Sequence, residues 1–405
     1  MNILVTGSGG FVGRNLVESL KAIRDGKDTR AQFSPLLPLT VFECGSSTSH
    51  EELSRYCSQA DFVFHLAGVN RPQNSDEFMK GNCNFLSDVL DLLEFHSNCC
   101  PVVLASSIQA SLSGRFEGSE YGKSKLEAEH VLRKYAQKTG AHIFIYRFPN
   151  LFGKWCRPNY NSVVATFCDA IANDRGYSIS DPDVELELLY IDDLIGELIS
   201  LLMGGGHRCS YEDGVRTSGN DFFYCPGSVP IKLGDLAEML EGFRRNKDSL
   251  EVYGFEEGSL SKKLWSTYQS YIEAEGLIRS LGTHADARGS FTELLRSRDS
   301  GQVYVNISKP GITKGNHWHH SKWEKFIVLS GEALIRIRRL GEDRDGRCFP
   351  VDEYQVSGDV LQEIEVPPGA THSITNLSST CDLITLIWAN EPFDAENPDT
   401  FFEEV

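Results

Sequence analysis

The sequence lacks the marks of several protein classes. Its eleven cysteines include no C-x-x-C pair, which argues against a zinc ribbon and against a disulfide framework, and favours a reducing cytosol. No apolar run approaches the length that spans a bilayer, and no repeat or low-complexity tract stands out. Because the first predicted strand begins at Asn2, we expect no signal or transit peptide before it and a cytoplasmic location.

Basic residues are in deficit. Lysine and arginine together number 39 against 57 aspartates and glutamates, which gives a formal net charge of -18. An acidic surface repels nucleic acid and anionic lipid, so we expect neither nucleic acid nor a membrane as a partner. An anionic small ligand is compatible with this charge, because backbone amides and a few local cations can hold phosphate. The length of 405 residues predicts two domains, each large enough to bury a core.

The beginning of the chain predicts a nucleotide-binding corner. The stretch NILVTG predicts a short buried strand, and GSGGFVG leads into a helix near Phe11, so Gly7, Gly10 and Gly13 lie between strand and helix. Glycines there let the backbone approach a pyrophosphate, whose charge the helix N-terminus favours. A glycine triplet alone also fits an ordinary tight turn. Further strands predicted at LTVFEC, DFVFHLAG, PVVLASS and HIFIYRFP alternate with helical stretches, which predicts a Rossmann-type α/β domain with a doubly wound parallel sheet.

The YGKSK motif supplies groups that suit the reduction of a ketone. It places Tyr121 and Lys125 one helical turn apart on one face, and Ser107 ends the strand before it. An ammonium stabilises a neighbouring phenolate, so Lys125 can adapt Tyr121 to proton transfer near neutral pH. The serine hydroxyl can hold a carbonyl oxygen while a hydride reaches its carbon and the tyrosine supplies the proton. Tyrosine and lysine at this spacing are also common on solvated helix faces.

Together these motifs resemble the extended short-chain dehydrogenase/reductases that act on nucleotide sugars. The resemblance includes HLAG at His65–Gly68 and YIDDL at Tyr190–Leu194. It implies that Ser107, Tyr121 and Lys125 form a catalytic triad. The cofactor-binding residues that we predict are Gly7, Gly10, Phe11, Val12, Gly13, Arg14, Leu66, Ala67, Gly68, Tyr121 and Lys125.

The choice between NADP and NAD depends on two residues. An acidic residue at the end of the second strand normally binds the adenosine ribose and excludes the additional phosphate of NADP. Glu43 lies near this point but can precede the critical position, and Arg14, directly after the last glycine, can pair with a 2′-phosphate. We therefore predict NADPH; the alternative interpretation of Arg14 is a solvated helix residue.

The sequence pattern changes from about Glu256. The stretch SKKLWSTYQSYIEAEGLIRSL predicts a helical connector, and beyond DARGSF short predicted strands are separated by glycine and proline. We therefore divide the chain into a reductase domain of residues 1–275 and an all-β domain of residues 276–405.

Four side chains of the second domain predict a metal site. In an extended segment His317 and His319 point to the same side, while the residues that follow each of them point to the other. Glu324 follows after a short turn, and PPGATHSITN adds His372. Such ligands suit zinc, iron(II), manganese or nickel, and the ligand types alone do not choose. A lone histidine is more often a hydrogen-bonded structural residue, but four such groups favour a metal.

This part of the chain resembles the cupins, which are small double-sheet jelly rolls. The first cupin signature runs from Gly311 to Gly331. The second cupin signature is matched by Pro367, Gly369, His372 and Asn376. The metal ligands that the resemblance implies are His317, His319, Glu324 and His372, and the metal that it favours is zinc.

From end to end the chain resembles the bifunctional CapF/WbjC-type enzymes of bacterial capsule and O-antigen synthesis. The segments that carry the resemblance are HLAGVNRP, RFPNLFGKWCRPNYNSVVATFC, RGSFTE, GQVYVNISKPGITKGNHWHH and NPDTFFEEV. Relative to that family, the chain carries extra residues at Asp25–Pro38 and in the loop GGGHRCSYEDGVRTSGNDF. We expect both to be surface insertions. The resemblance implies conversion of UDP-2-acetamido-2,6-dideoxy-4-keto-hexose to UDP-2-acetamido-2,6-dideoxy-L-talose, a precursor of UDP-N-acetyl-L-fucosamine. We also expect a homodimer.

The chemistry of the substrate sets the order of the two reactions. A ketone at C-4 acidifies the proton on C-3 and no longer does so once it is reduced, so C-3 epimerisation in the cupin must precede NADPH-dependent reduction. Candidate bases for the epimerisation are Lys314, His320, Lys325 and Tyr304, and the sequence does not choose among them. The substrate-binding residues that we predict are Asn150, Arg157 and Asn161; the alternative there is a loop packed on the sheet.

Two other functions are compatible with the sequence. The chain can be a single-activity reductase whose cupin is structural or dimerising, or a sugar-nucleotide sensor with a degenerate active site. Intact Ser107, Tyr121 and Lys125 argue against the sensor. Exchange of the C-3 hydrogen with solvent distinguishes the bifunctional enzyme from the single-activity reductase.

Overall fold

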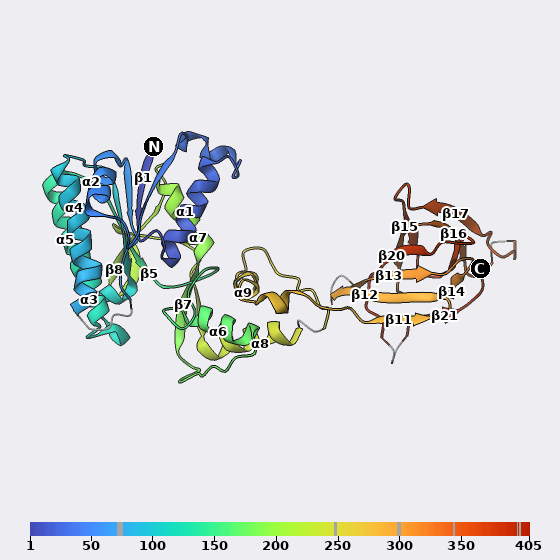
Figure 1. Ribbon diagram of the computed structural model, residues 1–405. Coiled ribbons are helices and arrows are strands. Elements are labelled where there is room, and N and C mark those ends of the chain that lie inside the picture. The colour runs from blue at the N-terminus through green and yellow to red at the C-terminus, as the bar shows by residue number, and fades with distance from the viewer. Residues whose placement is uncertain (71–75, 247–248, 298–300, 343–344, 395, 397) are drawn as a thin grey trace. The chain divides into compact units, whose positions relative to one another are not determined.

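The computed structural model describes the chain except for residues 71–75, 247–248, 298–300, 343–344, 395 and 397. The described residues form two compact units, coloured from blue to red along the chain in Figure 1. The first consists of Met1–Glu241 and Gly258–Glu273, and the second of Gly242–Glu257 and Ala274–Val405. The segment Gly242–Glu257 precedes residue 275, the predicted end of the first domain, yet it groups with the second unit.

The first unit is built on a seven-stranded sheet of order β2-β1-β3-β4-β5-β9-β8. Its first five strands in the chain pair in parallel, as the alternation of strands and helices predicts. The predicted Rossmann-type fold is therefore confirmed. The strands of this sheet are β1 (Asn2–Thr6), β2 (Thr40–Cys44), β3 (Phe62–His65), β4 (Val102–Ser107), β5 (Ile143–Phe148), β8 (His207–Glu212) and β9 (Val215–Tyr224).

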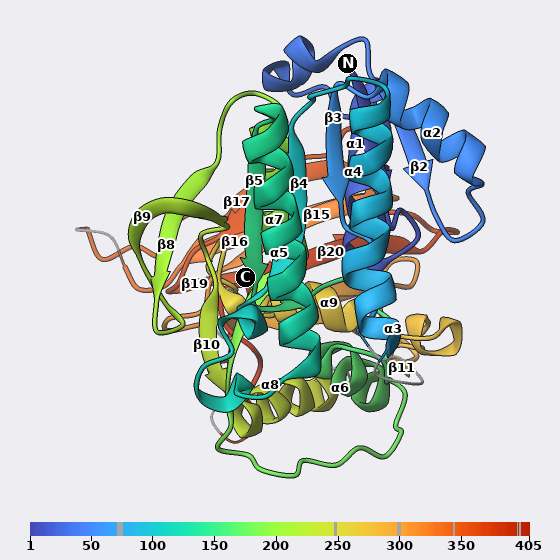
Figure 2. The ribbon, with the colours of Figure 1, turned by 90° about the vertical axis from the view of Figure 1, so that its left-hand side faces the viewer.

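Helices cover both faces of this sheet. The helices α1 (Phe11–Arg24) and α7 (Ile191–Leu201) bury leucines such as Leu16 and Leu198 in one core cluster. A second cluster lies under α2 (His50–Gln59), α4 (Phe85–Phe95) and α5 (Glu120–Thr139), and Figure 2 shows α4 and α5 side by side in front of the sheet. Apolar residues repeat along each helix about once per turn, which gives each a single buried face.

The two segments expected to be surface insertions are mostly exposed, but each also contributes to the fold. In the first, Phe33 and Leu36 of a short 3₁₀ helix, Ala31–Leu36, are buried in the core. The second contributes most of the hairpin β8–β9, in which Cys209 is buried, and β9 joins the sheet beside β5 through Phe223, the residue directly after the segment, which pairs with Tyr146. Both segments contain apolar residues whose burial depends on partners far away in the sequence.

Smaller elements complete the first unit. A three-stranded sheet has the order β10-β7-β6, and α6 packs against α9. The predicted helical connector is too long, because α9 ends at Gln269 and only a 3₁₀ turn, Ala274–Leu277, follows. The bounds are α3 (Asp76–Met79), β6 (Asn150–Phe152), α6 (Val163–Ala172), β7 (Glu185–Tyr190), β10 (Val229–Lys232), α8 (Leu233–Asn246), which extends into the second unit, and α9 (Leu260–Gln269).

The second unit is a sandwich of two antiparallel sheets, which confirms the predicted cupin-like all-β domain. Their orders are β11-β12-β13-β20-β15-β18 and β17-β16-β19-β14-β21. Alternate residues of the strands, such as Phe326 and Val328 of β15, Ile335 of β16 and Ile374 of β19, form the core. The strands are β11 (Thr283–Asp286), β12 (Gly289–Ser297), β13 (Gly301–Ser308), β14 (Thr313–Trp318), β15 (Glu324–Ser330), β16 (Glu332–Arg339), β17 (Asp352–Ser357), β18 (Glu363–Val366), β19 (Ala370–Asn376), β20 (Leu383–Ala389) and β21 (Phe401–Phe402).

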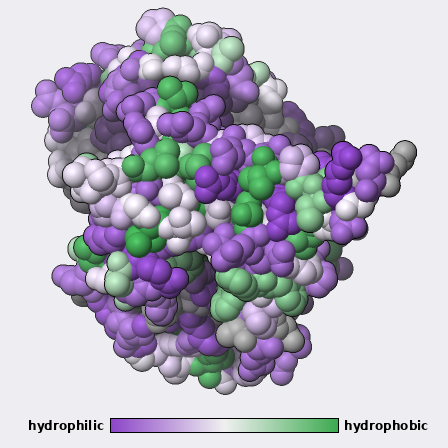
Figure 3. Space-filling view, turned by 90° about the vertical axis from the view of Figure 1, so that its right-hand side faces the viewer, coloured by the Kyte–Doolittle hydropathy of each residue, from purple (hydrophilic) through white to green (hydrophobic). Residues whose placement is uncertain are grey.

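The cysteines and the surface agree with the composition. All eleven cysteines are free thiols. Among the residues that the structure describes, no helix combines the length and the apolar character needed to cross a bilayer. In the view of Figure 3, hydrophobic side chains form small separate groups among hydrophilic ones, as on ordinary globular surfaces.

Candidate functional site

The glycines between β1 and α1 form a corner that side chains would block. Gly7 has a φ of +68°, and a Cβ added there would lie 2.7 Å from the backbone of Ala67. A Cβ on Gly13 would lie 2.0 Å from the carbonyl oxygen of Gly7. The helix begins after Gly10 with no side-chain cap and no acidic residue in its first turn. Its first amides can therefore receive a phosphate, so the corner fits a dinucleotide.

A cleft of about 770 Å³ opens beside this corner. The structure brings most of the predicted residues to its walls. From the triad and the cofactor set these are Gly7, Gly10, Phe11, Val12, Gly13, Leu66, Gly68, Ser107, Tyr121 and Lys125, and from the substrate set Asn150, Arg157 and Asn161. Two predicted residues do not line the cleft. Ala67 packs behind Gly7, and the guanidinium carbon of Arg14 lies 4.4 Å from the ring centre of Trp155, which does line it.

The end of β4 and the start of α5 bring the triad together. Ser107 is the last residue of β4, and Ser119 caps α5 by accepting a hydrogen bond from the amide of Gly122 at 3.0 Å. A Cβ on Gly122 would lie 2.3 Å from the carbonyl oxygen of Gln109. Gly122 therefore lets the helix approach the turn after β4, which brings Tyr121 near Ser107. Gly122 is not among the site residues predicted from the sequence, although it stands inside the YGKSK motif.

Burial controls the charges of the triad. It lowers the pKa of Lys125 to about 8, against the opposing effect of the Glu129 carboxylate. The lysine donates a hydrogen bond to the carbonyl oxygen of Ala105 at 2.9 Å. Burial also raises the pKa of Tyr121, although interaction with Ser107 opposes this. At neutral pH the tyrosine is therefore a phenol with a proton to donate, next to a lysine ammonium.

A buried ion pair lies behind the triad, and the sequence analysis missed it. The guanidinium of Arg147 donates two hydrogen bonds to the carboxylate of Glu129, at 2.9 and 2.7 Å. The hydroxyl of Ser106 donates to the same carboxylate at 2.6 Å. Glu129 lies one turn after Lys125 on α5, and this spacing is the only signal that the sequence offers. The network connects α5 to the strand that carries Ser107.

Among the described residues that line the cleft, none is an acidic residue of β2. The carboxylate of Glu43 instead pairs with the ammonium of Lys21 on α1 at 2.7 Å. At the other end of the cleft, the amide of Asn150 donates to the carbonyl oxygen of Glu187 at 3.2 Å, and Arg157 lies over the ring of Tyr160.

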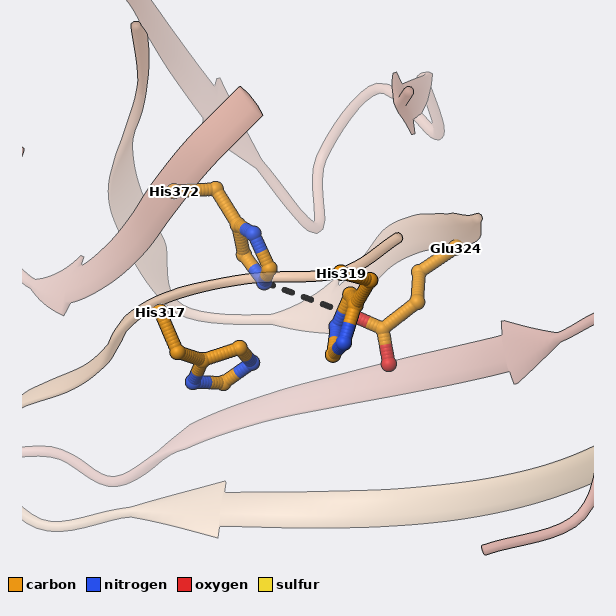
Figure 4. Close-up of side chains that lie close together, drawn as sticks. All are labelled: His317, His319, Glu324 and His372. Atoms are coloured by element: carbon orange, nitrogen blue, oxygen red, sulfur yellow. Dashed lines mark ion pairs between the residues drawn. The ribbon is translucent and has the colours of Figure 1, made fainter. Parts of the chain in front are cut away.

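The four predicted metal ligands converge inside the second unit (Figure 4). His317 belongs to β14 and pairs in register with His372 of β19, while His319 and Glu324 lie on either side of the turn into β15. One ligand atom from each of the four lies within 4.8 Å of those of the others. The Nε2 atoms of His319 and His372 lie 3.6 and 3.3 Å from the same oxygen of Glu324.

The charges of this cluster suit a cation. Burial and the neighbouring His372 lower the pKa of His317 to about 4, so its imidazole is neutral. Burial raises the pKa of Glu324, but interactions with His319 and His372 outweigh this and lower it. Among the described residues, the Nε2 atom of His319 and both ring nitrogens of His372 are buried without a hydrogen-bond partner. Unpaired buried nitrogens beside a carboxylate fit a divalent metal.

The structure separates the four candidate bases into two groups. The hydroxyl of Tyr304 donates to Glu324 at 2.9 Å, and the ammonium of Lys314 donates to the side chain of Asn306 at 2.6 Å. A bulge between Gly315 and His317 puts Lys314 on the inner face of the sheet, opposite the buried Ile374. Burial lowers the pKa of Lys314.

The other two candidate bases are engaged away from the cluster. The ammonium of Lys325 pairs with Glu363 at 2.7 Å and with Glu365 at 3.0 Å. The exposed ring of His320 packs against Trp318 and Phe401, with ring centres 4.6 and 5.0 Å apart.

Known proteins resemble this chain over its whole length. Residues 3–204 match the NAD dependent epimerase/dehydratase family, and residues 284–401 match the polysaccharide biosynthesis C-terminal domain. A Pseudomonas aeruginosa protein, UDP-2-acetamido-2,6-beta-L-arabino-hexul-4-ose reductase, is 37% identical over 99% of this chain and 98% of its own. The crystal structure of the capsular polysaccharide assembling protein CapF from Staphylococcus aureus covers 100% of both chains, with 42% identity and a TM-score of 0.84. The chain belongs to the CapF family.

Membership in the CapF family accounts for the joining of two unlike folds in one chain. A further CapF structure, in complex with the inhibitor 3-isopropenyl-tropolone, is 39% identical over 100% of both chains, with a TM-score of 0.81. As a member of the CapF family, the chain is an oxidoreductase of polysaccharide biosynthesis that uses a nicotinamide cofactor.

Proposed function

We propose that the chain is a bifunctional nucleotide-sugar enzyme. Its second unit epimerises C-3 of a UDP-2-acetamido-2,6-dideoxy-4-keto-hexose, and its first unit reduces the C-4 ketone with NADPH to give UDP-2-acetamido-2,6-dideoxy-L-talose. The observation that carries the proposal is the presence of two complementary sets of groups in separate units. A proton donor with a dinucleotide corner lies in one, and three histidines with a carboxylate lie in the other.

The groups of the first unit suit ketone reduction. NADPH, when bound, would supply the hydride. The hydroxyl of Ser107 holds the ketone oxygen, and Tyr121 gives its phenol proton to that oxygen as C-4 receives the hydride. The raised pKa of Tyr121 keeps this proton in place until it is needed. The ammonium of Lys125, 5.8 Å from the centre of the tyrosine ring, stabilises the phenolate that forms.

The preference for NADPH over NADH is supported by the surroundings of the ribose-binding strand. Glu43 is engaged with Lys21, so its carboxylate is not directed at the cleft. The guanidinium of Arg14 lies over the ring of Trp155, a residue of the cleft wall, and we propose that it pairs with the 2′-phosphate.

The cluster of the second unit suits zinc. His317, His319, Glu324 and His372 would hold the ion, which would supply a Lewis acid for the substrate carbonyl. The inhibitor of the CapF relative supports a metal, because tropolones carry a carbonyl and a hydroxyl oxygen side by side and chelate divalent ions. A proton transfer needs no change of oxidation state, which favours zinc over iron.

The epimerisation needs a group that removes the C-3 proton and a group that returns one to the opposite face. Lys314 and Tyr304 are the two candidates, since both side chains lie on the inner side of the sandwich. The ketone must still be present for C-3 to be acidic, so this step precedes the reduction. One 4-keto sugar nucleotide then serves both units.

An NMR time course in deuterated water tests the proposal. Without NADPH, the 4-keto sugar nucleotide should acquire deuterium at C-3 in the presence of the protein. With NADPH added, the signals of the L-talo product should appear with deuterium retained at that carbon. Reduction without deuterium at C-3 would contradict the epimerase and leave a single-activity reductase whose cupin is structural or dimerising.

A further inference from the structure

The last residues of the chain lie against the strand that carries the metal-cluster histidines. The short strand β21 pairs with β14, with Phe402 opposite His317 and Phe401 opposite Trp318. The rings of Trp318 and Phe401 stack with centres 4.8 Å apart, on the side of the strand opposite the cluster. The hydroxyl of Thr371, the neighbour of His372, donates to the carbonyl oxygen of Glu403. The tail is therefore held by backbone, ring and side-chain contacts.

The carboxylate of Asp399 holds the turn between β14 and β15. It accepts hydrogen bonds from the main-chain amides of His320 at 2.7 Å, Ser321 at 2.8 Å and Lys322 at 3.0 Å. This turn connects His319 to Glu324, so its shape sets the separation of two proposed ligands. Hydrogen bonds from amides to a carboxylate are charge-assisted and stronger than neutral ones. One side chain thus fixes three successive residues between the two ligands.

The main chain of Asp399 holds the ring of His319. Its carbonyl oxygen lies within hydrogen-bond reach of Nδ1 of that imidazole. A carbonyl oxygen can only accept, so Nδ1 carries a proton, and in the neutral ring Nε2 then keeps its lone pair. Nε2 is the buried nitrogen that faces Glu324 at 3.6 Å. The contact therefore selects the tautomer that a metal requires.

We propose that Asp399 is a positioning residue for the metal cluster: its carboxylate fixes the turn after His319 and thereby keeps its own carbonyl oxygen against the ring of that histidine. The inference rests on the proposed metal site. Residues that orient a ligand in this way typically change metal affinity by 10- to 100-fold when they are replaced. The contact joins residues 80 positions apart, which explains why the ligand motif alone does not reveal it.

Zinc titration of the full-length chain tests this role. The wild type, Asp399→Ala, Asp399→Asn and the control Glu404→Ala are stripped with a chelator and titrated with zinc against a colorimetric competitor. Glu404 lies in the same tail, and its main-chain oxygen, not its carboxylate, accepts from Arg338. We expect zinc affinity to fall roughly tenfold or more in Asp399→Ala, less in Asp399→Asn, and to stay unchanged in Glu404→Ala. Cobalt-substituted Asp399→Ala should also show an altered visible spectrum, which a purely structural role would not produce.

The outcomes distinguish failure of the positioning role from failure of the metal site. Wild-type zinc affinity and an unchanged cobalt spectrum in both Asp399 variants would overturn the positioning role while leaving the metal site intact. A wild type that binds no zinc would overturn the metal site and this inference with it. If Asp399→Ala fails to fold, the Asp399→Asn variant decides, because it keeps the size of the side chain and one acceptor oxygen.

Discussion

Lys125 lies one helical turn after Tyr121, with its ammonium nitrogen 5.8 Å from the centre of the tyrosine ring. The ammonium of Lys125 lines the cleft and uses one of its three N–H groups to donate to the carbonyl oxygen of Ala105. In the proposed reduction, this arrangement suits proton donation by the tyrosine and charge stabilisation by the lysine. Both residues belong to the first unit, whereas the histidine cluster belongs to the second.

Replacing Tyr121 by Phe should abolish reduction and spare epimerisation. Because we propose the phenol as the proton donor, its loss should slow ketone reduction by roughly 10²- to 10⁴-fold, measured by NADPH consumption. Deuterium uptake at C-3 should continue at the wild-type rate, because the cluster lies in the other unit. Loss of both activities in a folded variant would contradict the division of labour.

The rate of reduction should depend on pH through Lys125. Its pKa of about 8 means that the ammonium is present below this pH and is lost above it. Because the charged form stabilises the phenolate, kcat/KM for reduction should decline as pH rises through about 8 in the free enzyme. The raised pKa of Tyr121 means that the phenol does not cause this decline. A flat profile from about pH 7 to 9 would argue against the role given to Lys125.

The buried pair of Arg147 and Glu129 should matter for stability. Arg147→Met leaves the Glu129 carboxylate buried without its partner, which typically costs about 3–5 kcal/mol in the free energy of unfolding. The matched control is Lys232→Met, which breaks the exposed pair with Asp183 and should cause no measurable loss. Urea denaturation of both variants compares them, and equal midpoints would show that the buried pair is not stabilising.

Arg14 should contribute to the choice of cofactor. Arg14→Ala should reduce the preference for NADPH over NADH by roughly tenfold, the equivalent of about one hydrogen bond to a charged group. The control is Arg24→Ala, at the other end of α1, where the guanidinium pairs with Asp25. The measurement is the ratio of kcat/KM values for the two cofactors. Equal values in the wild type would refute the assignment of NADPH.

Local patterns in the sequence predict the features that depend on neighbouring residues. The glycines around Gly7 predict the corner because its backbone conformation is encoded within a few positions. Alternation along an extended segment predicts that His317 and His319 face one side, and the structure brings them together with Glu324 and His372.

The features that the sequence does not predict depend on contacts between distant residues or on breaks in a regular pattern. The hairpin β8–β9 resembles an insertion in the sequence because it joins the sheet through a pairing of β9 with β5, a strand about 75 positions earlier in the chain. The bulge at Gly315 reverses the side on which Lys314 lies, which simple alternation cannot anticipate. The Asp399 contact joins the tail to a turn 77 to 80 positions earlier.

Metal dependence of the C-3 exchange tests the central claim most directly. The folded wild type is stripped with a chelator, checked by elemental analysis, and assayed by NMR for deuterium uptake at C-3 before and after zinc is restored. The account predicts about one zinc per chain, loss of exchange on stripping and recovery on restoration. The His317→Ala variant should bind no zinc and should show no C-3 exchange even after zinc is restored. It should still reduce a ketone that is already epimerised. Exchange at the full rate by a folded, metal-free wild type would contradict the account, because the histidines would then act as bases or hydrogen-bonding groups rather than as ligands.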